Sequence, residues 1–408
     1  MSLDRMSLLQ SPSLKIIDKA LGNTSLPGNN YVLSLTALDN HYAASASSPS
    51  NQIHLFDRAS LQAVRILSGH DIATSHLRTI NALGMSSRAM LLSSGKDGCV
   101  KAWDERTGTT SIEMVTSGRL RPLLCCDASN NGLTVAAGTD LQKEDAFILY
   151  WDPRNPAAPL RTHGSTHSDD ITAVHFLKYG PSPSSRDVLF STSSDGLICT
   201  SNSLEDDEDE AVLHVGNWGC SVSQGGWICD ARGTRVWAAS DMETFSYWST
   251  ELDRIQDIDI RNPSLHHHGH TWVTDYLITC HSTPRAESGL GVFVGSNEGD
   301  VALISSRDLS DASVAWTIHS IWTTGHNGVV RSILWDEENR VLVTGGEDSK
   351  INAWHVHDMY ATSSSQMGDQ KGDDMELDSH GLKREWDDSM DISDIGSVSY
   401  SYPPKLVD

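Results

Sequence analysis

The sequence predicts an all-β protein built from one repeated sheet, and three observations point to this class. The chain repeats a Trp-Asp pair: "CVKAWDERTG" begins at Cys99 and "FILYWDPRN" at Phe147, and their tryptophans are Trp103 and Trp151. Short stretches of two-residue hydrophobic alternation lie between turn residues, which is typical of β-strands. The 408 residues include twelve Trp and only six Phe, a ratio that a repeat with one Trp per unit produces.

The repeated unit consists of an apolar strand, a strand of small residues, an Asp-Gly type turn, and an apolar strand that ends in Trp-Asp. Its clearest copies are "INALGMSSRAMLLSSGKDGCVKAWDERTG", from Ile80, and "VVRSILWDEENRVLVTGGEDSKINAWHVHD", from Val329. When the repeats are aligned on the Trp position, seven units follow one another. The residues at this position are Phe56, Trp103, Trp151, Ser201, Trp248, Ile304 and Trp354. The spacing exceeds the usual period of about 40–45 residues, and Pro-, Gly-, Ser- or charge-rich loops account for the excess.

These units resemble WD repeats, and seven of them imply a seven-bladed β-propeller. Three stretches, "DAFILYWDPRN", "THSDDITAVHFLKYGPSPSSRDVLFSTSSDG" and "GGEDSKINAWH", resemble the WD repeat-containing protein 89 family. The expected organisation is a disordered start at residues 1–12, a propeller at 13–360 and an acidic, disordered tail at 361–408. The tail has 11 acidic and 4 basic residues and few aliphatic ones, so it cannot bury a core.

The ring must close between its first and last repeats. The last repeat supplies three strands and then turns polar. In related propellers a strand from the N-terminus supplies the fourth. The apolar stretch "LKIIDKAL", from Leu14 to Leu21, is otherwise unassigned. We therefore expect it to pair with the strand Ile351–His355.

The WD resemblance also implies a buried hydrogen-bond relay of four residues in a blade. The last repeat matches it with His326, Thr344, Asp348 and Trp354. The second repeat has Ser93, Asp97 and Trp103, with either His70 or His76 as the histidine. The fourth keeps His167, Ser191 and Asp195 but has Ser201 in place of Trp.

A Ser-His-Asp trio can also be a hydrolase triad. The sequence has no G-x-S-x-G nucleophile turn, and the trio recurs from repeat to repeat together with Trp. A triad would be needed once. The sequence therefore favours a structural role and predicts that the protein is not an enzyme.

The repeated Trp-Asp-x-Arg motif has two interpretations. In one, the tryptophans are buried, and Asp104, Arg106, Asp152 and Arg154 form solvated turns. In the other, the motif works as it does in substrate receptors of cullin-4 ubiquitin ligases. There, arginines on consecutive repeats dock the adaptor, and Arg is suited to this because it forms bidentate bonds that Lys cannot.

Two loops and the tail carry further alternatives. The stretch His266–His270 is interpreted as a flexible loop rather than a metal site, because a site needs fixed geometry. The run Glu205–Glu210 is either a solvated spacer or a docking point for a basic partner. The tail segment "LKREWDDSMDISDI" is either a solvating stretch or a segment that becomes ordered on a partner.

Composition narrows the classes of partner. The chain has 54 acidic residues and 30 Lys plus Arg, a formal charge of -24. This charge disfavours a surface that binds nucleic acid, because such surfaces need clustered Lys and Arg side chains. The seven cysteines form no CxxC pair, so we expect no metal, no cofactor and no disulfide framework. The chain shows neither a signal-like apolar segment nor a bilayer-spanning run. We expect an intracellular protein of the cytoplasm, the nucleus or both, away from membranes.

Together these features predict a non-catalytic scaffold or adaptor that binds other proteins in an intracellular complex. The alternatives are a substrate receptor of a cullin-4 type ligase and, less in keeping with the motifs, an enzyme. The first face to examine for partners carries the loops near His76, Asp170, His270 and Asn327.

Overall fold

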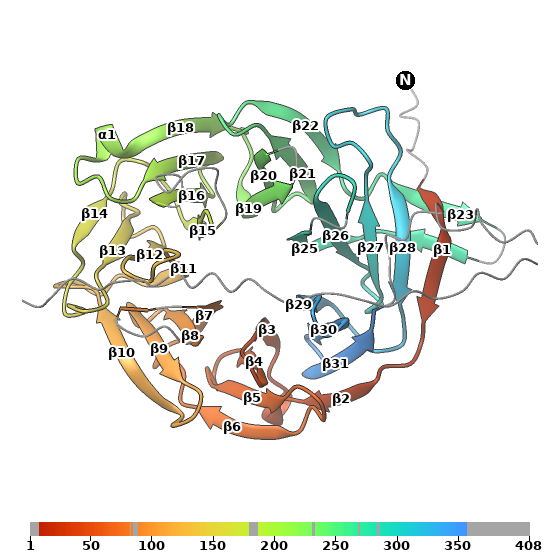
Figure 1. The fold of residues 1–408 in the computed structure, drawn as a ribbon, viewed down its shortest axis with the longest axis horizontal. Helices are drawn as coiled ribbons and strands as arrows, with labels where there is room; N and C mark the ends of the chain where they lie inside the picture. The colour runs from red at the N-terminus through yellow and green to blue at the C-terminus, as the bar shows by residue number, and fades with distance from the viewer. Residues whose placement is uncertain are drawn as a thin grey trace, which may run out of the picture. The chain divides into compact units, whose positions relative to one another are not determined.

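Seven sheets follow one another around a ring in the computed structural model of the protein (Figure 1). The structure describes residues 8–81, 83–84, 89–178, 187–230, 233–267, 270–283 and 286–356. The predicted seven-bladed β-propeller is confirmed. The predicted tail at 361–408 lies outside the described residues and stays a prediction.

Each blade has four antiparallel strands, and the first of them lies innermost. The first four blades are β3 (Val32–Ala37), β4 (His41–Ala46), β5 (Ile53–Asp57) and β6 (Ala63–Leu67); β7 (Thr74–Ile80), β8 (Met90–Gly95), β9 (Cys99–Asp104) and β10 (Thr109–Val115); β11 (Leu123–Ala128), β12 (Val135–Thr139), β13 (Ile148–Trp151) and β14 (Arg161–His163); and β15 (Ile171–Phe176), β16 (Val188–Ser193), β17 (Leu197–Asn202) and β18 (Val212–Asn217).

The last three blades follow the same plan, with additions from the N-terminus. They are β19 (Val222–Asp230), β20 (Gly233–Ser240), β21 (Thr244–Trp248) and β22 (Arg254–Asp259); β25 (Tyr276–Ser282), β26 (Leu290–Gly295), β27 (Val301–Ser305) and β28 (Thr317–Trp322), extended by β1 (Leu9–Ile17); and β29 (Val330–Asp336), β30 (Val341–Gly346) and β31 (Lys350–His355), completed by β2 (Gly22–Ser25). Outside the blades lie η1 (Pro27–Asn29), α1 (Glu208–Ala211) and a hairpin of β23 (Ser264–His267) and β24 (His270–Val273).

The repeat positions marked in the sequence coincide with one structural position. All seven lie in the third strand of a blade: Phe56, Trp103, Trp151, Ser201, Trp248, Ile304 and Trp354. Their side chains are buried, because a strand in the middle of a blade is covered on both faces by neighbouring blades. The apolar or aromatic side chain at this position in six of the seven repeats is therefore a packing requirement of stacked sheets, and Ser201 is the exception.

The hydrophobic core lies between blades rather than within them. One cluster joins Val100 and Met114 of the second blade to Leu123, Leu149 and Trp151 of the third. Fully burying one side chain of this size stabilises the fold by about 1.5–3 kcal/mol. A blade removed from the ring would expose two such faces, so no blade is stable by itself.

In six of the seven innermost strands a β-bulge follows the first paired residue, and in β25 it follows the second. The pairing shifts between Thr74 and His76, and at the corresponding place in five of the other blades. At two bulges a hydroxyl reaches the next blade: Ser75 Oγ donates to the Leu123 carbonyl at 2.7 Å, and Thr172 Oγ1 donates to Val222 at 2.8 Å. These bonds fix neighbouring blades at the same level around the channel.

The ring closes between its ends as predicted, but through a different segment. β2 pairs antiparallel with β31, from Gly22 opposite Ala353 to Ser25 opposite Lys350. The expected strand at Leu14–Leu21 is therefore wrong. The sequence of β2, "GNTS", has no apolar signal because its pairing uses backbone groups at the outer rim, so hydrophobicity did not reveal it.

The apolar stretch before β2 belongs instead to β1, which is a fifth strand of the sixth blade. β1 pairs in parallel with β28, with Ile16 opposite Ile321 and Ile17 opposite Trp322. It covers the outer edge of β28, an edge that would otherwise offer unpaired backbone groups. The expected disorder of residues 1–12 is accordingly wrong for residues 9–12, which lie in β1.

Two stretches interpreted as loops from the sequence include regular secondary structure. Of the stretch His266–His270, the first two residues end β23 and the last begins β24, and His266 pairs with Thr271. The acidic run includes α1, and Glu208 accepts hydrogen bonds from the backbone N–H groups of Gly164, Ser165 and Thr166 at 2.7–2.9 Å. Local backbone groups that need acceptors explain this order. Among the described residues no helix combines the length and apolar character that crossing a membrane requires.

Candidate interaction site

The predicted relay residues of the second and seventh blades lie in hydrogen-bonding contact. In the second blade, Trp103 Nε1 donates to Ser93 Oγ at 2.8 Å, and His70 lies 2.8 Å from both Ser93 Oγ and Asp97 Oδ1. His70 therefore occupies the position that the sequence left open between His70 and His76. The Asp97 carboxylate only accepts, so Nδ1–H of His70 donates to it. In this tautomer of the neutral imidazole, Nε2 accepts from the Ser93 hydroxyl, which in turn accepts from the indole.

The seventh blade repeats this arrangement. His326 Nε2 lies 2.8 Å from Thr344 Oγ1, which accepts from Trp354 Nε1 at 3.0 Å, and His326 Nδ1 lies 2.9 Å from Asp348. Burial raises the pKa of the Asp348 carboxyl. Hydrogen bonds from His326 and the Asn327 backbone lower this pKa by more than burial raises it, so the net shift is downward. The aspartate is thus held charged beneath the turn.

The fourth blade has the same trio without the tryptophan. His167 Nε2 lies 2.8 Å from Ser191 Oγ, whereas its Nδ1 lies 3.5 Å from Asp195. Burial raises the pKa of Asp195, but the neighbouring His167 and hydrogen bonds from the backbone N–H groups of Ser168 and Leu197 outweigh it and lower the pKa to about 2. The turn is therefore kept even though Ser201 replaces the indole.

These trios are unsuited to hydrolysis because their hydroxyl groups are buried. The side chains of Ser93, Ser191 and Thr344 have no exposed surface. A nucleophile must reach a substrate carbonyl, and the neighbouring blades prevent any such approach. The geometry supports a structural role.

The Asp-x-Arg part of each repeated motif lies at the surface, in the turn between third and fourth strands. Arg106 donates through Nε and a terminal nitrogen to both oxygens of Asp104, at 3.2 and 2.9 Å. Arg154 does the same to Asp152, at 2.9 and 2.7 Å. The arginine side chains are 66% and 53% exposed, so each turn presents a pre-formed guanidinium to solvent.

Both turns lie on the same face of the ring. The first and third strands of a blade run in the same direction, so their C-terminal ends meet at one edge. β9 and β13 end in this way on adjacent blades, at Asp104 and Trp151. The face that carries these turns is called the Arg106 face below.

A third pair of the same geometry was not recognised in the sequence. Arg261 donates to both oxygens of Asp259 at 2.9 and 2.8 Å. Its signal, Asp-x-Arg in "DIRNP", was present but follows a fourth strand, so it lies on the opposite face. Two of the loops that the sequence suggested for partner binding, with Asp170 before β15 and Asn327 before β29, lie on that opposite face as well. His76, in contrast, lies inside β7 and not in a loop.

The chain has the fold and the relay geometry of WD repeats, and two segments match the sequence model of the WD domain, G-beta repeat: residues 61–104 and 317–355. The chain therefore contains WD repeats. Both matched segments start near the fourth strand of one blade and end with the third strand of the next. This one-strand offset explains why the WD-repeat protein needs β2 to complete its last blade.

Relatives extend the likeness over most of the WD-repeat protein. It is 26% identical over 352 residues to WD repeat-containing protein 89 homolog of Dictyostelium discoideum, covering 84% of this chain and 89% of that protein. It is 26% identical over 342 residues to WD repeat-containing protein GTS1 of Arabidopsis thaliana, covering 80% and 81%. The resemblance to the protein 89 family is confirmed.

Solved structures share the fold. A chain of the crystal structure of the mitotic checkpoint complex matches with a TM-score of 0.62 at 14% identity, covering 88% of the WD-repeat protein and 98% of that chain. At this identity the match establishes the propeller fold alone.

All seven cysteines are free thiols, and no group of three or more His, Cys, Asp or Glu side chains in the described ranges is placed to hold a metal ion. Burial raises the pKa of Cys125 and of Cys199 to about 12, so these thiols stay protonated and unreactive.

Proposed function

We propose that the protein is a non-catalytic scaffold that holds other proteins on the Arg106 face. The observation that carries this proposal is the pair of exposed, identically folded Asp-x-Arg turns on adjacent blades. A rigid ring holds both turns at fixed spacing, so a partner that binds them loses little conformational entropy on the scaffold side.

One specific form of this function is a substrate receptor of a cullin-4 type ubiquitin ligase. Arg106 and Arg154 stand on consecutive blades and on one face, as that mode of docking requires. Each arginine is engaged by its own aspartate, which fixes the direction of the guanidinium and leaves it open to solvent. Asp104 and Asp152 are therefore positioning residues in this proposal.

The test is quantitative affinity purification of the tagged full-length protein from cells, comparing wild type with Arg106→Ala plus Arg154→Ala. We expect at least one stable partner whose recovery falls more than fivefold in the double variant. The matched control is Arg261→Ala, which removes the same kind of ion pair from the opposite face and should leave recovery unchanged.

Two outcomes would contradict these proposals. Equal recovery of the cullin-4 adaptor from wild type and the double variant, or no recovery from wild type, would exclude the receptor role. Absence of any protein that co-purifies in stoichiometric amounts, or equal loss in the Arg261→Ala control, would exclude the Arg106 face as a docking surface.

A further inference from the structure

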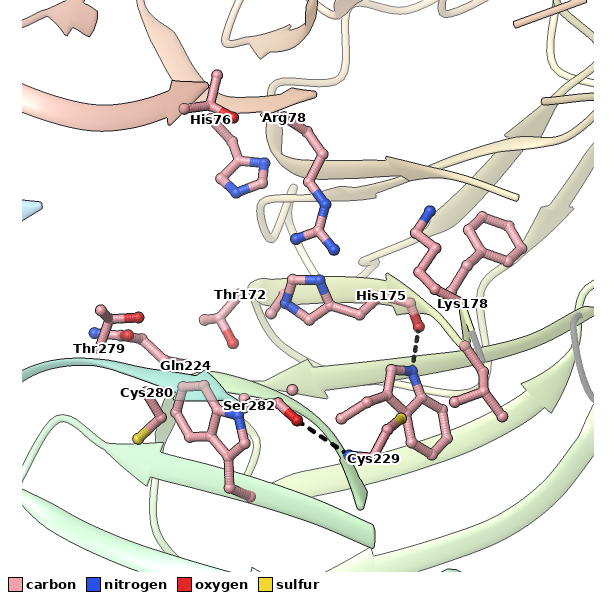
Figure 2. A pocket seen from close by; sticks show the side chains of 18 of the residues that line it. His76, Arg78, Thr172, His175, Lys178, Gln224, Cys229, Thr279, Cys280 and Ser282 are labelled. Carbon is pink, nitrogen blue, oxygen red and sulfur yellow. Dashed lines mark hydrogen bonds between the residues drawn. The ribbon is translucent and has the colours of Figure 1, made fainter. Parts of the chain in front are cut away.

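The centre of the ring contains a cavity of about 1700 Å³ lined by the first strands of the blades. This volume exceeds the 300–1,000 Å³ typical of small-molecule sites. Figure 2 shows the side chains of Arg78, His175 and Lys178 directed into one part of this cavity, with His76 beside them. The group formed by Arg78, Lys178, His76, His175 and the buried Asp127 is called the channel cluster.

The fold brings the channel cluster together through the register of three consecutive blades. Arg78, Asp127 and His175 each stand four residues after the first paired residue of β7, β11 and β15. They therefore lie at one level, and Lys178 follows β15 at the same edge. Since first strands end on the Arg106 face, the channel cluster lies at the mouth of the channel on that face.

Two cations share a single carboxylate oxygen in this cluster. Arg78 Nε lies 3.2 Å and Lys178 Nζ 3.1 Å from Asp127 Oδ1. Asp127 also accepts from the backbone N–H of Ala128 at 2.8 Å and of Phe176 at 2.9 Å. Asp127 is fully buried and is saturated by these donors, so one positive charge of the pair has no counter-charge within the cluster.

Part of each cation stays exposed to the cavity, although Lys178 Nζ also donates to the Ala128 carbonyl. The side chains of Arg78 and Lys178 are 29% and 31% exposed, and among the described residues the terminal guanidinium nitrogens of Arg78 make no hydrogen bond. His76 Nδ1 and His175 Nδ1 are shielded from solvent and have no partner within the described ranges. Since solvent does not reach these two atoms, they do not contact a ligand in the open cavity. The exposed parts of Arg78 and Lys178 therefore carry the site.

We propose that the channel cluster binds a small anion carrying phosphoryl groups. A guanidinium fork and an ammonium within reach of one oxygen atom match the geometry of phosphoryl oxygens. The chain carries a net charge of -24, which repels large polyanions such as nucleic acids from the surface. A small anion, in contrast, is held by the local excess of positive charge inside the mouth.

The test is isothermal titration of the full-length protein with pyrophosphate at pH 7, with malonate as the carboxylate counterpart. We expect saturable binding of one pyrophosphate per chain and at least tenfold weaker binding of malonate. Arg78→Gln and Lys178→Gln should each weaken pyrophosphate binding at least tenfold. Asp127→Asn should strengthen it, because the competing carboxylate charge is removed.

The matched control is Arg331→Gln. Arg331 also lines the cavity but lies near the start of β29, at the other mouth, where it pairs with Glu347. We expect this variant to bind pyrophosphate within twofold of wild type. Thermal unfolding of each variant shows whether it is folded. If Arg78→Gln does not fold, the Lys178→Gln variant tests the proposal, because Lys178 follows the end of β15 and lies outside the strand.

Three results would overturn the proposal. They are no saturable binding of pyrophosphate by wild type up to millimolar concentration, equal affinity for malonate, or equal loss of affinity in Arg331→Gln and Lys178→Gln. In each of these cases the channel cluster is a structural ion group that only compensates the charge of Asp127.

Discussion

At the scale of the residue, the relay shows how one hydroxyl satisfies two buried groups. Ser93 Oγ accepts from Trp103 and donates to His70. Where the hydroxyl is missing, the indole bonds elsewhere: in the third blade, Ala137 stands at the corresponding position and Trp151 Nε1 donates to the Val115 carbonyl at 3.1 Å. A degenerate repeat thus keeps its tryptophan satisfied by a different partner.

We expect Ser93→Ala to lower the free energy of unfolding by about 2–3 kcal/mol, because both the indole N–H and the imidazole lose their buried partner. The measurement is equilibrium unfolding in urea. The matched control is Ser45→Ala, which removes a buried hydroxyl that has no hydrogen-bond partner among the described residues and should change stability by less than about 0.5 kcal/mol. Equal effects of the two substitutions would contradict a role for the relay in stability.

At the scale of the element, the two N-terminal strands perform different tasks. β2 completes the last blade with backbone pairing to β31, whereas β1 adds a fifth strand to the sixth blade. Leu14 and Ile17 pack against the clusters of the sixth and seventh blades. Hydrophobicity therefore identified a strand correctly, but its partner was set by the parallel register with β28.

Two truncations separate these tasks. Deleting residues 1–20 removes β1 and keeps β2, so we expect a destabilised monomer that still unfolds in one step. Deleting residues 1–25 also removes β2 and exposes the edge of β31, so we expect a further loss of several degrees in the midpoint of thermal unfolding and concentration-dependent aggregation. Calorimetry combined with light scattering checks this, and equal behaviour of the two truncations would contradict closure by β2.

At the scale of the whole molecule, acid should weaken the fold through two sets of groups. Burial lowers the pKa of His76 to about 4 and also lowers that of His326. These imidazoles take up protons on unfolding, so stability is lost as the pH falls below about 6.5. The carboxyl of Asp195, with a pKa of about 2, adds a second loss as the pH falls below about 4.

We therefore expect the free energy of unfolding to decrease steadily from pH 7 to pH 4 and to fall further below pH 4. At about 1.4 kcal/mol for each unit of pKa difference, His76 contributes up to about 3 kcal/mol of the first decrease. The variant His76→Gln should show a flatter dependence between pH 6.5 and pH 4 in urea unfolding. An unchanged slope in this variant would contradict the assignment to His76.

The sequence by itself determined the number of blades, the third strand of each and the residues of the relay, because these depend on local patterns that every repeat must satisfy to bury its two faces. The tertiary structure decided what depends on register and on neighbours. In the structure the relay histidine is His70 and not His76, and the ring is closed by β2 and not by Leu14–Leu21. Glu208 is held by a hydrogen bond from the backbone of Gly164.

The channel cluster belongs to the second group. Its members carry no shared sequence motif: Asp127 follows Arg78 by 49 residues, and His175 follows Asp127 by 48. These three residues meet because each stands four residues after the first paired residue of its strand, beyond the same bulge, and this places them at one level around the channel. A linear pattern records which residues a blade buries, whereas only the closed ring determines which side chains face one another across its centre.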